Sequence, residues 1–198
     1  MTRRTIYLAR HGETAWNREG RWQGHTDVAL NEAGRLQAHA LGQALIARGL
    51  VRAHASDLSR ARETAEIVAT LLGLPPVIPD AGLRERGFGI FEGLTREECE
   101  ARFPDEWARY RAGDGASPPG GEARPQVIER MRAAVRGVAA DLRAQHPTEG
   151  AALVVSHGGA MRLLVSSIVG ELPPPLENGA IFRLDLAGDE LAHAERVK

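Results

Sequence analysis

The alternation of short apolar runs with helical segments restricts the fold of this chain more than any other feature of its sequence. Strand-like runs lie at Ile6–Leu8, Val51–Asp57 and Gly150–Gly159. The segments in which apolar residues recur at helical spacing are Leu30–Gly49, Ser59–Gly73, Val127–Gln145 and the residues up to Val169. Strands that alternate with helices predict a layered α/β fold with a mainly parallel sheet.

The same pattern predicts helix ends and buried faces. In Leu30–Gly49, Asn31 is the expected N-cap and Gly49 the expected end. The inward face of this helix is predicted to comprise Ala33, Leu36, Ala40, Ala44 and Leu45. The inward residues of Ser59–Gly73 are predicted to be Ala65, Val68, Ala69 and Leu72. The remaining expected elements are an extended piece at Pro76–Pro79 and a hairpin of Gly179–Leu186 with Glu190–Val197.

Residues 81–125 differ in composition from the rest of the chain, because they are rich in glycine, proline and aromatic residues. This density predicts loops, with short helices near Thr95–Arg102 and Asp105–Arg111. We therefore expect one domain, residues 1–198, with a small cap insertion at about 81–125. The aromatic residues either form an apolar lining for a site or pack a small core of the insertion, and both readings stay open for Phe88, Phe91, Trp107 and Tyr110.

Composition excludes several classes of function. The net charge of −1 gives no electrostatic footprint for nucleic acid or for an anionic membrane surface. Cys99 is the only cysteine, which excludes an intrachain disulfide and a thiolate metal cluster. The first apolar run is too short for a signal peptide, and no stretch is long enough to span a bilayer. We expect a cytoplasmic protein.

Two of the predicted strands end in similar polar sequences. The first runs into Arg10, His11 and Gly12, and the strand before residue 157 runs into His157 and Gly158. Ligands of open α/β sheets bind beyond the carboxyl ends of the strands. If these two strands are parallel neighbours, the two histidines face each other over one pocket.

Other cationic groups suit an anionic ligand. Arg62 lies in the first turn of a predicted helix, where backbone N–H groups and an arginine fork favour phosphate, whereas Arg60 is predicted to be solvated. Glu85 lies between two arginines ahead of a glycine-rich segment. The sequence has no aspartate group suited to magnesium and no zinc motif, so we expect no metal and no cofactor. A histidine in line with phosphorus then acts as a nucleophile.

The chain resembles the histidine phosphatase superfamily, also called the phosphoglycerate mutase-like family. The matching segments occur in the family's order and are "RHGETAWNREGRWQGHTDVALNEAGRLQA", "SDLSRARETAE", "LRERGFGIFEG" and "VSHGGAMR". The resemblance implies a phosphoglycerate mutase-like three-layer fold, in which helices flank a mainly parallel central sheet. Within the superfamily, the chain most resembles the short phosphatase branch.

The resemblance also implies residue roles. His11 attacks phosphorus and becomes phosphohistidine, with its other ring nitrogen donating to a backbone carbonyl. Glu85 protonates the leaving oxygen and later deprotonates the attacking water. The groups implied to hold the phosphoryl oxygens are Arg10, Arg62 and His157, assisted by Asn17 and the Gly158 backbone. The implied substrate-loop positions are Gln23 and Gly24.

The first functional interpretation is a metal-independent phosphomonoesterase for small phosphorylated metabolites. Mutases of the family are longer and carry a basic insertion, whereas Glu97–Pro125 is short and has no paired-arginine motif. "PPGGEA" is similar to the Pro-x-Gly-Glu-Ser segment of the short phosphatases, with Ala123 in place of serine. The alternatives are a cofactor-dependent phosphoglycerate mutase and a non-catalytic phospholigand-binding protein. The substrate, its range and the oligomeric state stay open, a homodimer included.

Overall fold

A six-stranded sheet forms the centre of the molecule, in a computed structural model that describes residues 4–113, 116–146, 150–187 and 190–197. The strand order is β3-β2-β4-β1-β5-β6. The strands are β1 (Thr5–Arg10), β2 (Leu50–Ala55), β3 (Ile78–Pro79), β4 (Ala151–Ser156), β5 (Ile181–Ala187) and β6 (Glu190–Val197). The first four are parallel to one another, and β5 and β6 form an antiparallel hairpin at one edge. The mainly parallel sheet and the closing hairpin are confirmed.

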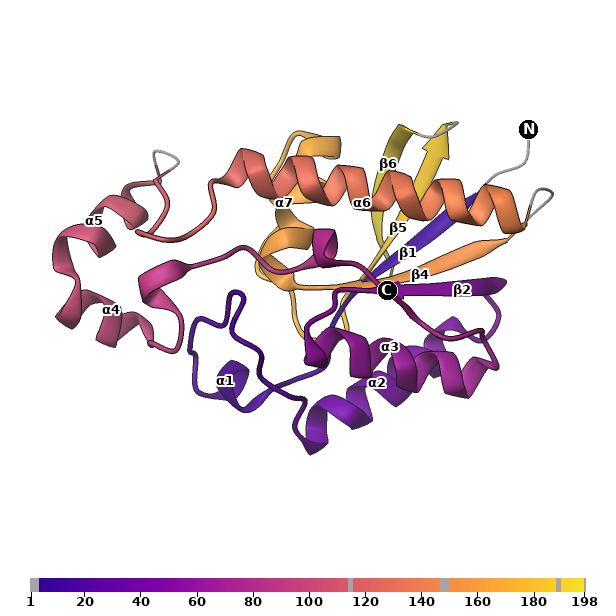
Figure 1. The fold of residues 1–198 in the computed structure, drawn as a ribbon, viewed down its shortest axis with the longest axis horizontal. Helices are drawn as coiled ribbons and strands as arrows, with labels where there is room; N and C mark the ends of the chain where they lie inside the picture. Colours follow the sequence, from indigo (N-terminus) through magenta and orange to yellow (C-terminus); the bar gives the residue numbers. More distant parts are fainter. Residues whose placement is uncertain (1–3, 114–115, 147–149, 188–189, 198) are drawn as a thin grey trace.

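Helices cover both faces of the sheet, as Figure 1 shows. On one face α6 (Arg124–Gln145) and α7 (Gly158–Val169) pack on Ile6 and Leu8 of β1. On the other face α2 (Glu32–Leu45) and α3 (Ser59–Leu72) pack on the alternate residues of the same strand, Tyr7 and Ala9. Successive side chains of a strand point to opposite faces, so a central strand with helices on both sides is apolar throughout. The three-layer α/β fold is confirmed.

Most helix ends agree with the sequence prediction. The Asn31 side chain caps α2 by accepting a hydrogen bond from Gly34 N at 2.8 Å. However, α2 ends at Leu45, before the predicted end at Gly49. Gly73 terminates α3 with a left-handed φ of +63°, a conformation that glycine adopts without steric cost. One short helix, α1 (Ala15–Arg18), was not predicted and begins at the Thr14 cap.

The predicted buried face of α2 is wrong. Leu36 is 66% exposed, and of the five predicted inward residues only Leu45 is buried. The face that packs inward contains Gly34 and Gly42. A Cβ atom on Gly34 would lie 2.2 Å from Glu13 O, so the helix approaches the loop after β1 through Gly34. The buried face also contains Ala38, Leu41 and Leu45, so it is rotated from the predicted face, and its two glycines are not counted in a pattern of apolar side chains.

The cap segment, residues 81–125, carries two short 3₁₀ helices, η1 (Ala81–Leu83) and η2 (Gly89–Phe91), and the helices α4 (Arg96–Arg102) and α5 (Pro104–Ala112). Positions 114–115 lie outside the described residues. Figure 1 shows α4 and α5 at the end of the molecule toward which β1 and β4 run. The aromatic side chains pack together: the Trp22 and Phe88 rings lie 4.6 Å apart, and those of Phe91 and Trp107 lie 5.6 Å apart. The cap segment therefore has its own small core.

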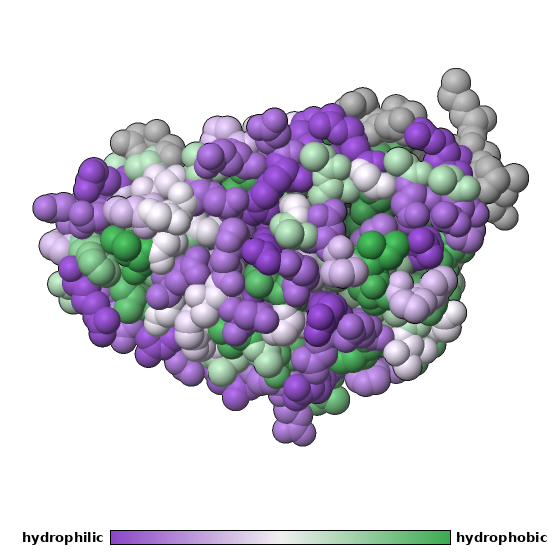
Figure 2. Space-filling view, viewed as in Figure 1, coloured by the Kyte–Doolittle hydropathy of each residue, from purple (hydrophilic) through white to green (hydrophobic). Residues whose placement is uncertain are grey.

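Hydrophilic side chains cover most of the face seen in Figure 2, and smaller hydrophobic areas interrupt them. Within the described ranges, no helix has both the length and the apolar character that a membrane crossing requires.

Candidate active site

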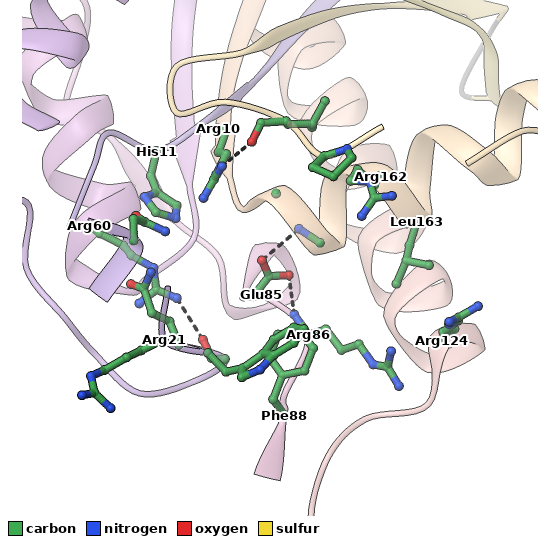
Figure 3. Close-up of a pocket in the computed structure, with 18 of the residues that line it drawn as sticks. Arg10, His11, Arg21, Arg60, Glu85, Arg86, Phe88, Arg124, Arg162 and Leu163 are labelled. Carbon is green, nitrogen blue, oxygen red and sulfur yellow. Dashed lines mark hydrogen bonds between the residues drawn. The ribbon is translucent and has the colours of Figure 1, made fainter. Parts of the chain in front are cut away.

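A pocket of about 360 Å³ opens at the carboxyl ends of β1 and β4, beside the cap segment (Figure 3). Because β1 and β4 are parallel neighbours with Arg10 opposite Ser156, the residues that follow them meet. The ring centroids of His11 and His157 lie 5.0 Å apart. The predicted site residues that line the pocket are Arg10, His11, Asn17, Gln23, Gly24, Glu85 and Gly158.

His11 is held in one tautomer. Its Nδ1 lies 2.6 Å from Gly12 O, and a carbonyl oxygen only accepts, so Nδ1 carries the proton and donates it. A Cβ atom on Gly12 would lie 2.3 Å from Gly34 O, so the loop packs tightly on α2 and fixes this geometry. Burial lowers the pKa of His11 well below its usual value, and Arg60 and Arg10 lower it further. The result is a neutral imidazole whose Nε2 lone pair is available.

His157 has the opposite tautomer. Arg60 Nε donates to His157 Nδ1 at 3.2 Å, so Nδ1 accepts and the proton lies on Nε2. That Nε2–H group is buried and has no hydrogen-bond partner among the described residues. Burial and the charge of Arg60 lower the pKa of His157 well below its usual value. His157 therefore presents a neutral N–H donor beside His11.

Arg60, rather than Arg62, is the arginine of α3 in the pocket. Its Nη1 donates to Thr26 O and its Nη2 to Gly24 O, both at 2.9 Å, and its side chain is buried. Burial lowers the pKa of Arg60 to about 10, so the side chain stays charged at neutral pH. Arg10 Nη1 donates to Leu176 O, and Arg10 Nε is a second buried donor with no partner in the part of the chain that the structure describes.

The prediction for Arg62 is wrong. Its side chain is 54% exposed and lies 3.5 Å from Glu66 one turn further along α3. Residues two positions apart on a helix point in nearly opposite directions, so only one of Arg60 and Arg62 faces the sheet. The sequence prediction chose the wrong member of the pair.

Glu85 lies against the N-terminus of α7. Its two carboxylate oxygens accept hydrogen bonds from Gly159 N at 2.9 Å and Ala160 N at 2.7 Å. A Cβ atom on Gly159 would lie 2.6 Å from Glu85 Oε1, so a larger residue there would displace the Glu85 carboxylate. Of the flanking arginines, Arg84 turns away to Asp57, and Arg86 lines the pocket. The sequence left the direction of these two side chains open.

The segment after His11 forms one wall of the pocket. Thr14 Oγ1 donates to Gln23 Oε1 at 3.0 Å, and Asn17 Oδ1 accepts from Thr14 N at 3.1 Å. Gly24 has a φ of +52°, and a Cβ atom there would lie 1.9 Å from Glu92 Oε1. Gly24 thus gives Arg60 its backbone acceptor at a position where other residues are strained.

Sequence reasoning missed a second set of pocket residues. They come from the cap segment, α6, α7 and the segment after α7, and they include Arg96, Arg124, Arg162, Leu163 and Leu172. Phe88 and Tyr110, for which the sequence left a lining role open, also line the pocket. No local motif joins them, so no sequence signal was available. Within the residues that the structure describes, no group of three or more His, Cys, Asp or Glu side chains is placed to hold a metal ion.

Comparisons with known proteins found similar sequences. Residues 6–193 match the sequence model described as "Histidine phosphatase superfamily (branch 1)". A protein named "Probable phosphoglycerate mutase GpmB", from Erwinia tasmaniensis, is 38% identical over 188 residues, which are 91% of this chain and 84% of the relative. "Phosphoglycerate mutase-like protein 4" of Arabidopsis thaliana is 36% identical over 80% of this chain and 68% of its own.

Solved structures are also similar. A mycobacterial glucosyl-3-phosphoglycerate phosphatase in complex with VO3 superposes with a TM-score of 0.82 at 29% identity, over 98% of this chain and 97% of its own. A phosphoserine phosphatase mutant of Entamoeba histolytica in complex with phosphoserine has a TM-score of 0.76 at 25% identity, over 98% and 95% of the two chains.

Proposed function

The chain belongs to the histidine phosphatase superfamily and is a histidine phosphatase; from this premise we propose that it hydrolyses small phosphorylated metabolites through a phosphohistidine, without a metal ion. One observation carries most of the argument. The Nδ1–H of His11 is committed to Gly12 O, which leaves the Nε2 lone pair free in a pocket rich in cationic donors. Neutral histidine in a fixed orientation is the form that attacks phosphorus.

In the first step, His11 Nε2 forms a bond to phosphorus while the bond from phosphorus to the ester oxygen breaks. Glu85, in its protonated form, gives its proton to that oxygen, and an alcohol leaves. In the second step, water attacks phosphorus, Glu85 takes the water proton, and the phosphorus–nitrogen bond breaks. The products are inorganic phosphate and the original neutral imidazole, so every proton and electron pair is accounted for.

The phosphoryl oxygens need donors throughout both steps. Arg10 Nε and His157 Nε2 are buried donors without a partner in the described ranges, and an anion between them satisfies both. Arg60 adds a charged fork that backbone carbonyls hold in place. Preorganised donors of this kind stabilise charge without reorganising during the reaction. They support phosphate binding by the protein alone.

A matched pair of arginine variants tests this assignment. Arg60→Lys keeps a positive charge but loses the fork, and we expect kcat/KM for p-nitrophenyl phosphate to fall about 10²- to 10³-fold, as for loss of an oxyanion donor. Arg62→Lys, two residues away on the exposed side of α3, should retain activity within about twofold, as expected of an exposed position. Thermal unfolding of both variants checks the fold. Equal losses in the two variants would reject Arg60 as the phosphate ligand.

Phosphoglycerate mutase is the second candidate, because two relatives at 38% and 36% identity are named "Probable phosphoglycerate mutase GpmB". We expect release of phosphate from several monoesters to exceed interconversion of 3- and 2-phosphoglycerate, even with 2,3-bisphosphoglycerate present for priming. We also expect full hydrolysis after exhaustive treatment with EDTA, and inhibition by vanadate. Coupled assays on one preparation compare the two reactions, and the His11→Ala protein measures any contaminating mutase.

Two outcomes of these assays would change the assignment. If interconversion of 3- and 2-phosphoglycerate is faster than hydrolysis of every ester tested, phosphoglycerate mutase becomes the better assignment. If chelation abolishes hydrolysis and magnesium restores it, the metal-independent mechanism is wrong.

A further inference from the structure

A second cationic cluster lies across Glu85 from the two histidines. The pocket lining contains seven arginines but one carboxylate, Glu85. Figure 3 shows Arg10 and Arg60 on the side of His11. Arg124 and Arg162 lie on the opposite side of Glu85, and Arg86 lies next to Glu85. This outer cluster consists of Arg86 after η1, Arg124 at the start of α6 and Arg162 in α7. Three distant segments supply it, which is why the sequence shows no adjacent pair.

The outer cluster has no carboxylate partner within the described residues. Arg86 Nε donates to Glu122 O and its Nη2 to Ser117 Oγ, whereas Arg162 Nε donates to Pro173 O at 2.7 Å. Arg124 makes no side-chain hydrogen bond or ion pair in the described part of the chain. These contacts orient Arg86 and Arg162, and the nearby charge of Glu85 offsets theirs only in part, without an ion pair.

Two other half-buried arginines of this protein form ion pairs with acids. Arg130 pairs with Glu122 at 2.8 Å, and Arg52 pairs with Asp141 at 3.0 Å. In the outer cluster, burial is the main cause that lowers the pKa of Arg86 and of Arg162. The charge of Arg124 lowers both pKa values further, and the charge of Glu85 opposes this without reversing it. Three cations that repel one another in a partly desolvated place are stabilised when an anion binds between them.

Aromatic side chains contact the Arg86 side chain of the outer cluster. The Arg86 guanidinium lies 5.6 Å from the Tyr110 ring centroid and 5.8 Å from that of Phe88, within the range of a cation–π contact. Tyr110 lies close enough to Arg124 and Arg162 for their charges to lower its pKa, although burial raises that pKa more strongly. The small core of the cap segment therefore supports one edge of the outer cluster.

We infer that Arg86, Arg124 and Arg162 bind a second anionic group on the leaving part of the substrate, so that the preferred substrates are phosphomonoesters carrying a carboxylate or a second phosphate. The inference rests on the proposed function, because it assumes that the first phosphoryl group lies against His11. Glu85, between the two clusters, is then next to the ester oxygen that links the two anionic groups.

Three esters of similar size test the inference. Glycerol 3-phosphate has an uncharged leaving group, 3-phosphoglycerate carries a carboxylate in the corresponding place, and glycerol 1,3-bisphosphate carries a second phosphate. We expect kcat/KM to be about 10- to 100-fold higher for an anionic ester than for glycerol 3-phosphate, the range expected of a hydrogen bond to a charged group. Preference for the carboxylate, the bisphosphate or both supports the subsite and identifies its anion. Equal values for all three esters would overturn the inference.

Variants assign the preference to these residues. Arg124→Gln and Arg162→Gln should each reduce the preference about tenfold, mainly through KM for the anionic ester. Arg124→Lys should restore part of it, which a merely structural role would not produce. Arg109→Gln on the exposed side of α5, outside the pocket lining, is the matched control and should not change the preference.

The two possible failures are distinguishable. If wild-type protein hydrolyses none of the three esters and no p-nitrophenyl phosphate, the proposed function fails. If it hydrolyses them but the preference survives in both glutamine variants, the function stands and the outer cluster is not the anion site.

Discussion

The His11→Ala variant is expected to lose phosphatase turnover by about 10⁴-fold or more, since removal of a catalytic nucleophile has effects of this size. Among the described residues around the pocket, no other side chain offers a neutral imidazole lone pair in the same place, because His157 Nδ1 already accepts from Arg60. The fold should remain, since His11 contributes one side-chain hydrogen bond to Gly12 O, worth about 1 kcal/mol of unfolding free energy. Steady-state assays and thermal unfolding measure the two effects.

His39→Ala is the matched control for this experiment. His39 is exposed on α2 and lies outside the pocket lining, so its loss should leave turnover within about twofold of wild type, as for most surface substitutions. If the His11→Ala protein retains near-normal kcat, covalent catalysis by this residue is wrong.

Glu85→Gln is expected to reduce turnover of alkyl phosphates by about 10²- to 10⁴-fold, the usual contribution of general acid–base catalysis. Glutamine keeps the shape of the side chain but neither gives nor takes the proton. An alkoxide is a poor leaving group and needs that proton, whereas p-nitrophenolate departs without help. The loss should therefore be much smaller for p-nitrophenyl phosphate when phosphorylation of His11 limits the rate.

The comparison of the two leaving groups also controls for structural damage. Glutamine loses at least part of the hydrogen bonding to Gly159 N and Ala160 N, so a purely positional defect would affect both esters alike. An equal loss for glycerol 3-phosphate and p-nitrophenyl phosphate would assign proton transfer to another group.

The sequence predicted the sheet and the meeting of the two histidines because both depend on local patterns. An apolar run followed by a polar residue and glycine indicates where a strand ends, and parallel neighbours bring such ends together. The structure confirms this for β1 and β4, whose following residues His11 and His157 lie in contact.

Two parts of the site depend on geometry that a pattern does not contain. The choice between Arg60 and Arg62 depends on the rotation of α3 about its axis, and both are compatible with an anion at the start of a helix. The outer cluster depends on how the cap segment, α6 and α7 approach one another. The predicted buried face of α2 was wrong for a related reason. The helix is rotated so that Gly34 and Gly42 face inward beside Leu41 and Leu45, and a pattern of apolar residues does not count glycines.

The most direct test of the central claim is to trap the phosphorylated enzyme. Rapid quenching of wild-type protein with a ³²P-labelled monoester should give label that is stable in base and labile in acid. Peptide mapping should place the label on His11, and phosphorus NMR should assign it to Nε2 because Nδ1 is committed to Gly12 O. The His11→Ala protein should remain unlabelled under the same conditions. Hydrolysis without such a label, or label that persists in the His11→Ala protein, would contradict the account.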